Sequence, residues 1–252
     1  MPVTIPAASA PALKLAAAQL RSDGYAILPG VFTPAETAAV LGTIATADTT
    51  SPRFRRSQDV FAIQNLLQEL PVLQEQLLTS GLRDVLAALF PTQTPHLVKA
   101  IYFDKPAGSN WLVAWHQDVM VAVIDRMELP GYGPWSSKGG ETTVLPPREI
   151  LESIVTVRLH LDDCDASNGA LRVVPSSHRH GVIPNDQHPT FTPQALTCAV
   201  PAGGVMLMQP LTLHASNRST SAQPRRVIHL EFSAAELPDG LQWRERLALP
   251  LT

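Results

Sequence analysis

The feature of this sequence that most limits its fold is a change of pattern near residue 95. Before that point apolar residues recur mainly at helical spacing, whereas after it short runs rich in Val, Ile, Leu and aromatic residues alternate with Pro and Gly. Strands that follow one another without intervening helices favour an antiparallel sandwich or barrel. We therefore predict one mainly β domain with flanking helices over residues 1–252, in which residues 1–95 give helical support and residues 96–235 form the β core.

The first ninety residues are predicted to be mainly helical. Thr33, Pro34 and Glu36 form a capping-box pattern, which begins a helix running to about residue 47. The other predicted elements are a helix over 11–20 that ends at Gly24, a strand over 25–28, and one or two helices over 61–89 interrupted at Pro71 and Gly81.

Seven strands are predicted after residue 95, at 96–103, 111–116, 154–161, 170–174, 204–208, 211–214 and 227–232. Residues 125–147 contain no comparable run and are predicted to be irregular. A loop of that size in a compact domain is usually functional, so it is either a lid over the site or an insertion without a role. Within it, Trp135 and Lys138 either contact substrate or lie at the surface.

The charge balance excludes partners that need a strongly basic surface. Lys and Arg number 19 against 22 Asp and Glu, a net charge of −3, which argues against nucleic-acid binding and against a polybasic membrane patch. No apolar run reaches the roughly 18 residues of a membrane span, and no secretory signal is recognised. We expect a cytoplasmic protein with a small-molecule partner and two free thiols, Cys164 and Cys198, although one bridge between them stays open. The sequence does not indicate an oligomeric state.

The strongest candidate site begins with His116 and Asp118, at the end of an apolar strand. Side chains two residues apart project from the same face of a strand, so both can approach one ion. His214 ends another predicted strand 96 residues after Asp118. Two His and one carboxylate are the ligand set that suits Fe(II) and leaves positions open for substrate and oxygen, whereas zinc more often takes a third His or a Cys.

Arg225 begins a predicted apolar strand 11 residues after His214. An inward-facing Arg in such a strand needs an anion, and a guanidinium holds a carboxylate with two parallel hydrogen bonds. The alternative is an ion pair within the protein. By strand alternation, Arg226 is predicted to face solvent.

In their order along the chain, five segments resemble the signature of the phytanoyl-CoA dioxygenase-like family of Fe(II)- and 2-oxoglutarate-dependent oxygenases, over about residues 25–232. The segments are His116-Gln117-Asp118, Ser167-Asn168-Gly169-Ala170-Leu171, Val174-Pro175-Ser176-Ser177-His178, His214 and Pro224-Arg225-Arg226. The resemblance implies a double-stranded β-helix, the cupin-like jelly roll, with an N-terminal helical layer. It implies Fe(II), 2-oxoglutarate as co-substrate and O2.

The resemblance also implies individual roles. His116, Asp118 and His214 would be the iron ligands, and Arg225 would pair with the distal carboxylate of 2-oxoglutarate. Ser216 would hydrogen-bond that same carboxylate, and its position two residues after His214 fits this role.

Two further residues, Lys99 and Arg158, are candidate co-substrate contacts. Lys99 lies on the strand before the metal motif and matches a polar contact in relatives. Arg158 shares one strand face with Thr156 and His160: if that face points inward, Arg158 is a buried cation that needs an anionic partner, either 2-oxoglutarate or substrate. If it points outward, Arg158 is an ordinary surface residue.

The reaction that the resemblance implies is hydroxylation of an aliphatic C–H bond of a small molecule, with release of succinate and CO2. Asp118 favours hydroxylation because related halogenases have a small residue there; desaturation and ring chemistry stay open. The alternatives are a non-oxidative cupin-like protein that binds a metal or ligand, and a regulatory protein that keeps the site without turnover.

Three other features have competing explanations. His178 and His180 are the main rival metal ligands, but no carboxylate lies near them at strand spacing. The run Arg53-Phe54-Arg55-Arg56 is either a solvated loop or a contact for an anionic substrate. The pair Asn168-Gly169 is predicted to form a turn that supports the fold.

Overall fold

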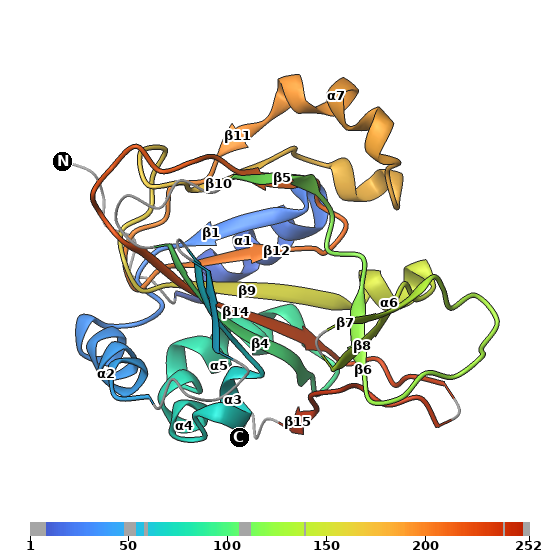
Figure 1. Ribbon diagram of the computed structural model, residues 1–252. Helices are drawn as coiled ribbons and strands as arrows, with labels where there is room; N and C mark the ends of the chain where they lie inside the picture. The colour runs from blue at the N-terminus through green and yellow to red at the C-terminus, as the bar shows by residue number, and fades with distance from the viewer. Residues whose placement is uncertain are drawn as a thin grey trace.

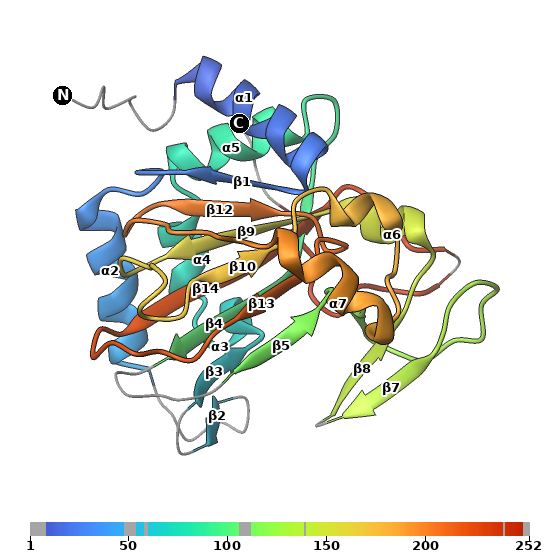
Figure 2. The same ribbon diagram turned by 90° about the horizontal axis from the view of Figure 1, so that it is seen from above.

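The computed structural model describes residues 9–47, 54–57, 60–105, 112–138, 140–238 and 240–248. Two antiparallel sheets face each other, with a layer of helices on the outer side of the larger one (Figures 1 and 2). The predicted mainly β fold with flanking helices is therefore confirmed. None of the helices in the described ranges combines the length and the apolar character that a membrane crossing requires.

Within the described residues, eight strands form the larger sheet, here called the major sheet. Their order is β1-β12-β9-β14-β4-β3-β2, and β15 also pairs with β4. The bounds are β1 (Tyr25–Leu28), β2 (Phe54–Ser57), β3 (Val60–Gln64), β4 (His96–Lys105), β9 (Ile154–His160), β12 (Val205–Met208), β14 (Arg225–Ser233) and β15 (Leu247–Ala248). Strands from both ends of the chain thus complete the sheet that β4, β9, β12 and β14 begin.

The second sheet, here called the minor sheet, has the order β11-β10-β13-β5. Its strands are β5 (Val113–His116), β10 (Leu171–Val173), β11 (Leu196–Thr197) and β13 (His214–Ser216). A third, smaller sheet has the order β6-β8-β7, formed by β6 (Val121–Val123), β7 (Trp135–Lys138) and β8 (Glu141–Val144).

The helices are α1 (Ala10–Asp23), α2 (Pro34–Ala45), α3 (Leu66–Glu69), α4 (Val72–Leu77), α5 (Ser80–Leu89), α6 (Arg148–Glu152) and α7 (His188–Phe191). Short 3-10 turns occupy Ser177–His180, Asn185–Gln187 and Thr192–Gln194. The predicted capping box is present, because the Thr33 hydroxyl accepts from the Glu36 amide and the Glu36 carboxylate accepts from the Thr33 amide at 2.7 Å. Gly24 ends α1 in the left-handed conformation at φ +82°.

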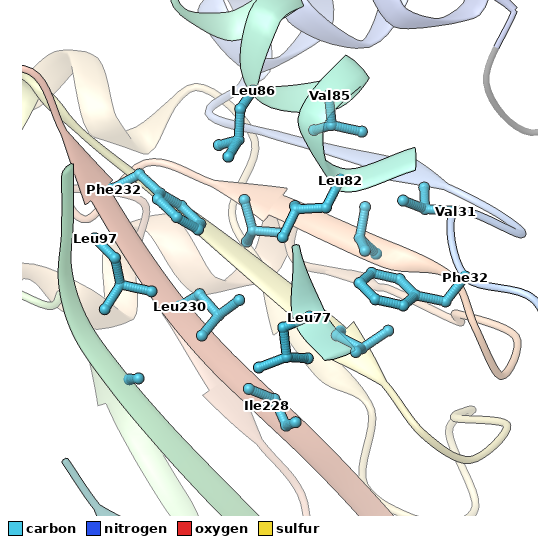
Figure 3. Close-up of a cluster of buried hydrophobic side chains, with 14 of the residues drawn as sticks. Val31, Phe32, Leu77, Leu82, Val85, Leu86, Leu97, Ile228, Leu230 and Phe232 are labelled. Atoms are coloured by element: carbon cyan, nitrogen blue, oxygen red, sulfur yellow. The ribbon is translucent and has the colours of Figure 1, made fainter. Parts of the chain in front are cut away.

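The main hydrophobic core lies between the helices and the outer face of the major sheet (Figure 3). Strand β14 contributes Ile228, Leu230 and Phe232 to this core, and α5 contributes Leu82 and Leu86. The residues of β14 that alternate with them point the other way, into the space between the two sheets. This alternation creates a polar interior on the side of the sheet opposite the core.

Two predictions for the N-terminal part were wrong. Residues 61–64, predicted as the start of a helix, belong instead to β3, because this segment pairs with β4 in the sheet. Gly81 does not interrupt a helix but lies in the first turn of α5, which Thr79 caps. A Cβ at Gly81 would come 2.3 Å from the Val31 carbonyl oxygen, so the glycine permits close packing of backbone on backbone.

Two predictions after residue 95 also need correction. The stretch 125–147 is not irregular throughout, because β7 and β8 form a hairpin in it that pairs with β6. The strand predicted over 211–214 begins only at His214 and runs to Ser216. Residues 211–213, predicted as the start of this strand, are buried in the turn that follows Pro210.

Candidate active site

The two predicted His ligands lie on neighbouring strands of the minor sheet. His214 on β13 is the direct cross-strand partner of His116 on β5, so both side chains project from the same face. Their ring centroids are 4.2 Å apart. His214 is buried, whereas the side chain of His116 is 39% exposed, so the pair is open to solvent on the β5 side.

Backbone carbonyls fix the orientation of both imidazoles. Nδ1 of His116 lies 2.8 Å from the Ala114 carbonyl oxygen, and Nδ1 of His214 lies 2.8 Å from that of Thr212. A carbonyl only accepts, so each Nδ1 carries the proton and each Nε2 keeps its lone pair. Burial, opposed by Asp118, lowers the pKa of His214 to about 4, so this ring is neutral at physiological pH.

Asp118 places its carboxylate between the two Nε2 atoms. Oδ1 lies 3.6 Å from Nε2 of His116, and Oδ2 lies 3.7 Å from Nε2 of His214. Burial alone would raise the pKa of Asp118, but the nearby His214, His229 and Lys99 outweigh burial and hold the pKa well below its ordinary value. The third predicted ligand is therefore an ionised carboxylate that faces both imidazoles.

Gln117, which points away from the ion site, holds the Asp118 turn in place. Its Nε2 donates to the carbonyl oxygens of Gly181 and Leu211 at 2.8 and 2.6 Å, and its Oε1 accepts from the Ile183 amide at 2.7 Å. One buried amide thus ties the turn after β5 to two other loops. The Asp118 amide adds a bond of 2.9 Å to the Pro210 carbonyl.

The triad opens into a cavity of about 290 Å³ between the two sheets. Its lining combines the triad with the apolar side chains Phe103, Val113 and Leu171 and with the polar side chains Arg158, Ser216, Arg225 and His229. The predicted inward orientation of Arg158 is therefore observed. The cavity lining contains six of the seven predicted site residues, from three distant parts of the sequence, together with His229; Lys99 is not part of the lining.

The inner end of the cavity is cationic. Arg225 is buried and forms no ion pair with any carboxylate in the described part of the chain, where its Nε also lacks a hydrogen-bond partner. Its register partner on β4 is Lys105, whose Nζ donates to the Asn217 carbonyl oxygen at 2.6 Å. Burial, and secondarily Arg225, lowers the pKa of Lys105 to about 8. Because Arg225 has no carboxylate partner among the described residues, its buried charge creates a strong demand for an anion.

Ser216 and Gly169 complete this end of the cavity. The Ser216 hydroxyl, on the same face of β13 as His214, donates to the Gly169 carbonyl oxygen at 2.8 Å. Gly169 has φ +83°, and a Cβ there would come 2.7 Å from Nζ of Lys105. The Asn168-Gly169 turn is therefore structural, as predicted, and it leaves space for the cations.

Arg158 and Lys99 are joined through two residues that the sequence analysis did not select. Nη1 of Arg158 lies 2.8 Å from Nδ1 of His229, and Nε2 of His229 lies 2.9 Å from a carboxylate oxygen of Glu231. The same oxygen accepts from Nζ of Lys99 at 3.0 Å. Lys99 is thus engaged by Glu231 rather than free to meet a ligand with its full charge.

The rival and peripheral candidates lie elsewhere. Nε2 of His178 is 3.3 Å from the Arg21 carbonyl oxygen, and His180 packs edge-on against Phe191. Neither joins a group of possible metal ligands in the ranges that the structure covers. Trp135 packs in the apolar cluster around β6 and β8 rather than lining the cavity.

Several smaller predictions are also resolved, or fall outside the described residues. Arg226 faces away from the cavity and binds Asp162 with both ends of its guanidinium, so it is ion-paired rather than simply solvated. Cys164 and Cys198 are free and buried. Arg53 and the side chains of Phe54, Arg55, Arg56 and Lys138 lie outside what the structure describes.

The side chains that the sequence analysis missed share one signal. His229 and Glu231 alternate with apolar residues along β14, on the face that begins with Arg225, and His160 and Lys105 occupy the same inward face of β9 and β4. Charged or imidazole groups at every second position of an otherwise apolar strand indicate a polar interior. The pattern that predicts an inward-facing Arg158 on β9 therefore also predicts inward-facing polar side chains on β14.

The residues present fit the metal and the dicarboxylate. An ion bonded at about 2 Å to nitrogen and oxygen ligands can span ligand atoms that are 3.6 to 3.7 Å apart. Two His and one Asp form an open three-ligand set typical of Fe(II) oxygenases. The buried guanidinium of Arg225, at the far side of the same cavity, supplies the charge that a carboxylate would neutralise.

Solved structures share this fold at low sequence identity. The epimerase SnoN from nogalamycin biosynthesis, solved with Fe3+, alpha ketoglutarate and nogalamycin RO, has a TM-score of 0.66 and 18% identity over 97% of each chain. EctD from S. alaskensis, solved with 2-oxoglutarate and 5-hydroxyectoine, has a TM-score of 0.65 and 19% identity over 92% of this chain and 78% of its own. EvdO2 from Micromonospora carbonacea var. aurantiaca, solved with 2-oxoglutarate, has a TM-score of 0.62 and 20% identity over 89% and 93%.

These similarities confirm the jelly-roll fold that the signature motifs implied. No curated protein matches the chain in sequence. The family model described as Phytanoyl-CoA dioxygenase (PhyH), however, matches residues 20–227, which is most of the chain. The chain belongs to the phytanoyl-CoA dioxygenase family, whose members are Fe(II)- and 2-oxoglutarate-dependent oxygenases with O2 as co-substrate.

Proposed function

We propose that this enzyme hydroxylates an aliphatic C–H bond of a small molecule and releases succinate and CO2. The observation that carries the proposal is that one cavity joins an open His-Asp-His triad to a buried guanidinium that forms no ion pair in the part of the chain that the structure describes. In this proposal His116, Asp118 and His214 hold Fe(II), and Arg225 holds the distal carboxylate of 2-oxoglutarate. Bound iron, 2-oxoglutarate and O2 together supply an oxidant for unactivated C–H bonds.

The other side chains of the cavity position the co-substrate and exclude water. Ser216 lines the same cavity as Arg225, and its hydroxyl, which donates to the Gly169 carbonyl oxygen in the structure, would turn to donate to the bound carboxylate. Phe103, Val113 and Leu171 supply the apolar part of the cavity lining, which would exclude water from the aliphatic chain of 2-oxoglutarate. Arg158 takes the chelating end of the co-substrate, and Lys99 supports it indirectly through Glu231 and His229.

One observation supports hydroxylation, and another supports a cytoplasmic setting. Asp118 provides a carboxylate ligand where a halogenase would need space for chloride. The free, buried thiols Cys164 and Cys198 are compatible with a reducing compartment.

The test combines co-substrate turnover with the mass of the product. Purified enzyme with Fe(II), ascorbate and 2-oxoglutarate is incubated with fractions of a metabolite extract, and succinate formation identifies the active fraction. A product 16 Da heavier than its substrate supports hydroxylation, whereas a product 2 Da lighter, or an isomer, would replace hydroxylation by desaturation, ring closure or epimerisation. A matched Asp118→Ala enzyme controls for succinate that arises from contaminants.

A further inference from the structure

Four polar side chains form a continuous chain of contacts across the inner face of the major sheet. Lys99 on β4 contacts Glu231 on β14 at 3.0 Å, Glu231 contacts His229 at 2.9 Å, and His229 contacts Arg158 on β9 at 2.8 Å. Glu231, His229 and Arg158 are all buried. The chain ends at the cavity that holds the triad, which Arg158 and His229 line.

The donors and acceptors of this chain can be assigned from chemistry alone. The Glu231 carboxylate only accepts hydrogen bonds, so the proton between it and His229 is on Nε2 of the imidazole. The Arg158 guanidinium only donates, so Nδ1 of His229 is the acceptor. His229 is therefore a neutral imidazole with one fixed tautomer, and both of its nitrogens are engaged.

The consequence is that Arg158 is oriented without being neutralised. A carboxylate in the place of His229 would fix the guanidinium and also cancel its charge. Arg158 forms no ion pair within the ranges that the structure describes, and its buried Nε has no hydrogen-bond partner there. Its full positive charge is thus directed at whatever anion occupies the cavity.

We infer that His229 is a positioning residue that aims Arg158 at the metal-chelating carboxylate of 2-oxoglutarate, and that Glu231, held by Lys99, fixes the imidazole in the tautomer that this requires. The inference rests on the proposed function, because it assigns the second end of the same co-substrate. Arg225 and Arg158 then hold the two ends of one dicarboxylate along a single cavity.

A competing role for His229 is metal binding, since Asp118, His229 and Glu231 also bring possible ligand atoms within 4.8 Å of one another. The hydrogen-bond assignment argues against it. Nε2 of His229 carries a proton that it donates to Glu231, and the lone pair of Nδ1 accepts a hydrogen bond from Arg158, so neither nitrogen is free to bind a metal. Metal stoichiometry separates the two roles.

The experiment measures co-substrate affinity rather than turnover. The protein is loaded with Fe(II) under anaerobic conditions, and 2-oxoglutarate is titrated while the visible charge-transfer absorption of the chelate is recorded. His229→Leu removes the acceptor and is expected to raise the Kd on the order of tenfold, the effect of one hydrogen bond to a charged group. His229→Asn keeps an acceptor toward Arg158 and is expected to restore most of the affinity.

A double variant shows whether His229 acts through Arg158. Arg158→Gln is expected to weaken binding at least as much as His229→Leu, and combining the two is expected to add nothing further, because the second change acts on a group already removed. The matched control is Thr156→Val, on the same face of β9 as Arg158. It removes a buried hydroxyl that has no hydrogen-bond partner among the described residues. This control is expected to leave the Kd unchanged.

The outcomes separate the two proposals. If the unmodified protein binds Fe(II) but develops no absorption with 2-oxoglutarate, the proposed function itself fails. The positioning role is refuted in two cases, provided that the unmodified protein does develop the absorption. In the first, His229→Leu binds 2-oxoglutarate as tightly as the unmodified protein. In the second, the effect of His229→Leu simply adds to that of Arg158→Gln. Loss of bound iron in His229→Leu would show that His229 is a ligand. Should His229→Leu misfold by circular dichroism, His229→Phe, which also lacks an acceptor, replaces it.

Discussion

Replacing Arg225 by Met is expected to strengthen the fold while weakening co-substrate binding. Arg225 is buried beside Lys105, without a carboxylate partner in the described part of the chain. Lowering the pKa of Lys105 from 10.5 to about 8 corresponds to about 3 kcal/mol of unfavourable free energy when this lysine is protonated in the fold. Because the folded pKa is the lower one, this cost is fully present below about pH 8 and disappears as the pH rises toward 10.5.

The size of the effect follows from how this cost is divided. Burial is the larger cause of the lowered pKa and Arg225 a smaller one, so removing the guanidinium should recover only the smaller part of this cost at Lys105. Removing the unpaired charge of Arg225 itself adds to this gain. We expect Arg225→Met to raise the free energy of unfolding of the metal-free protein by about 1 to 3 kcal/mol at pH 7. Losing two charge-assisted hydrogen bonds should weaken 2-oxoglutarate binding on the order of a hundredfold.

The measurement is urea unfolding followed by circular dichroism, repeated at pH 7 and pH 10 without ligand, together with the KM for 2-oxoglutarate. The stability gain should be larger at pH 7 than at pH 10, where Lys105 is already losing its proton. Arg226→Met is a suitable comparison, since Arg226 is paired with Asp162 outside the cavity. An Arg225→Met protein that is less stable than the unmodified one at pH 7, or that keeps its KM, would refute the assignment of Arg225 as an unsatisfied cation waiting for an anion.

Three further predictions test other parts of the structure. His116→Ala and Asp118→Ala should each abolish 2-oxoglutarate turnover and lower the iron content of purified protein; full activity in either would remove the mechanism. Glu245→Gln should flatten the pH dependence of stability, because burial raises the pKa of this carboxyl from 4.5 to about 7. A raised acid pKa costs stability as the pH increases from 4.5 to 7, so the variant should be more stable than the parent by up to about 3 kcal/mol at pH 8 in urea unfolding; parallel curves would contradict this. Gln117→Leu should lower the free energy of unfolding by about 3 kcal/mol, since it leaves buried backbone groups without partners, and an unchanged urea midpoint would argue against the clamp.

The sequence was sufficient for those parts of the fold that depend on local chemistry. The capping box at Thr33, the helix end at Gly24 and the strand over residues 25–28 are set by a few neighbouring residues and were predicted correctly. Residues 61–64 were predicted wrongly, because a short apolar run is compatible with either a helix or a strand, and only its pairing with β4 makes it a strand. The hairpin of β7 and β8 was missed for a similar reason, because its strands are polar and only their pairing with each other identifies them as strands.

For the site, spacing within one strand was informative and spacing between strands was not. His116 and Asp118 were linked by strand alternation, but only the register of β13 against β5 shows that His214 is the cross-strand partner of His116. Likewise, the contact of Arg158 with His229 depends on the pairing of β9 with β14. A motif selects residues; which of them touch is decided by long-range pairing, and His229 belongs to no motif that was recognised.

The strand that carries the first half of the metal motif has an unprotected side. Strand β5 is at the end of the minor sheet, where β13 is its one neighbour in the described structure, and their register is irregular between His214 and Ser216. An iron ion that binds both His116 and His214 would therefore cross-link the edge strand β5 to β13. Metal binding would make it harder for β5 to separate from β13. Hydrogen exchange at the amides of residues 113–118 would therefore report metal loading even when no substrate is known.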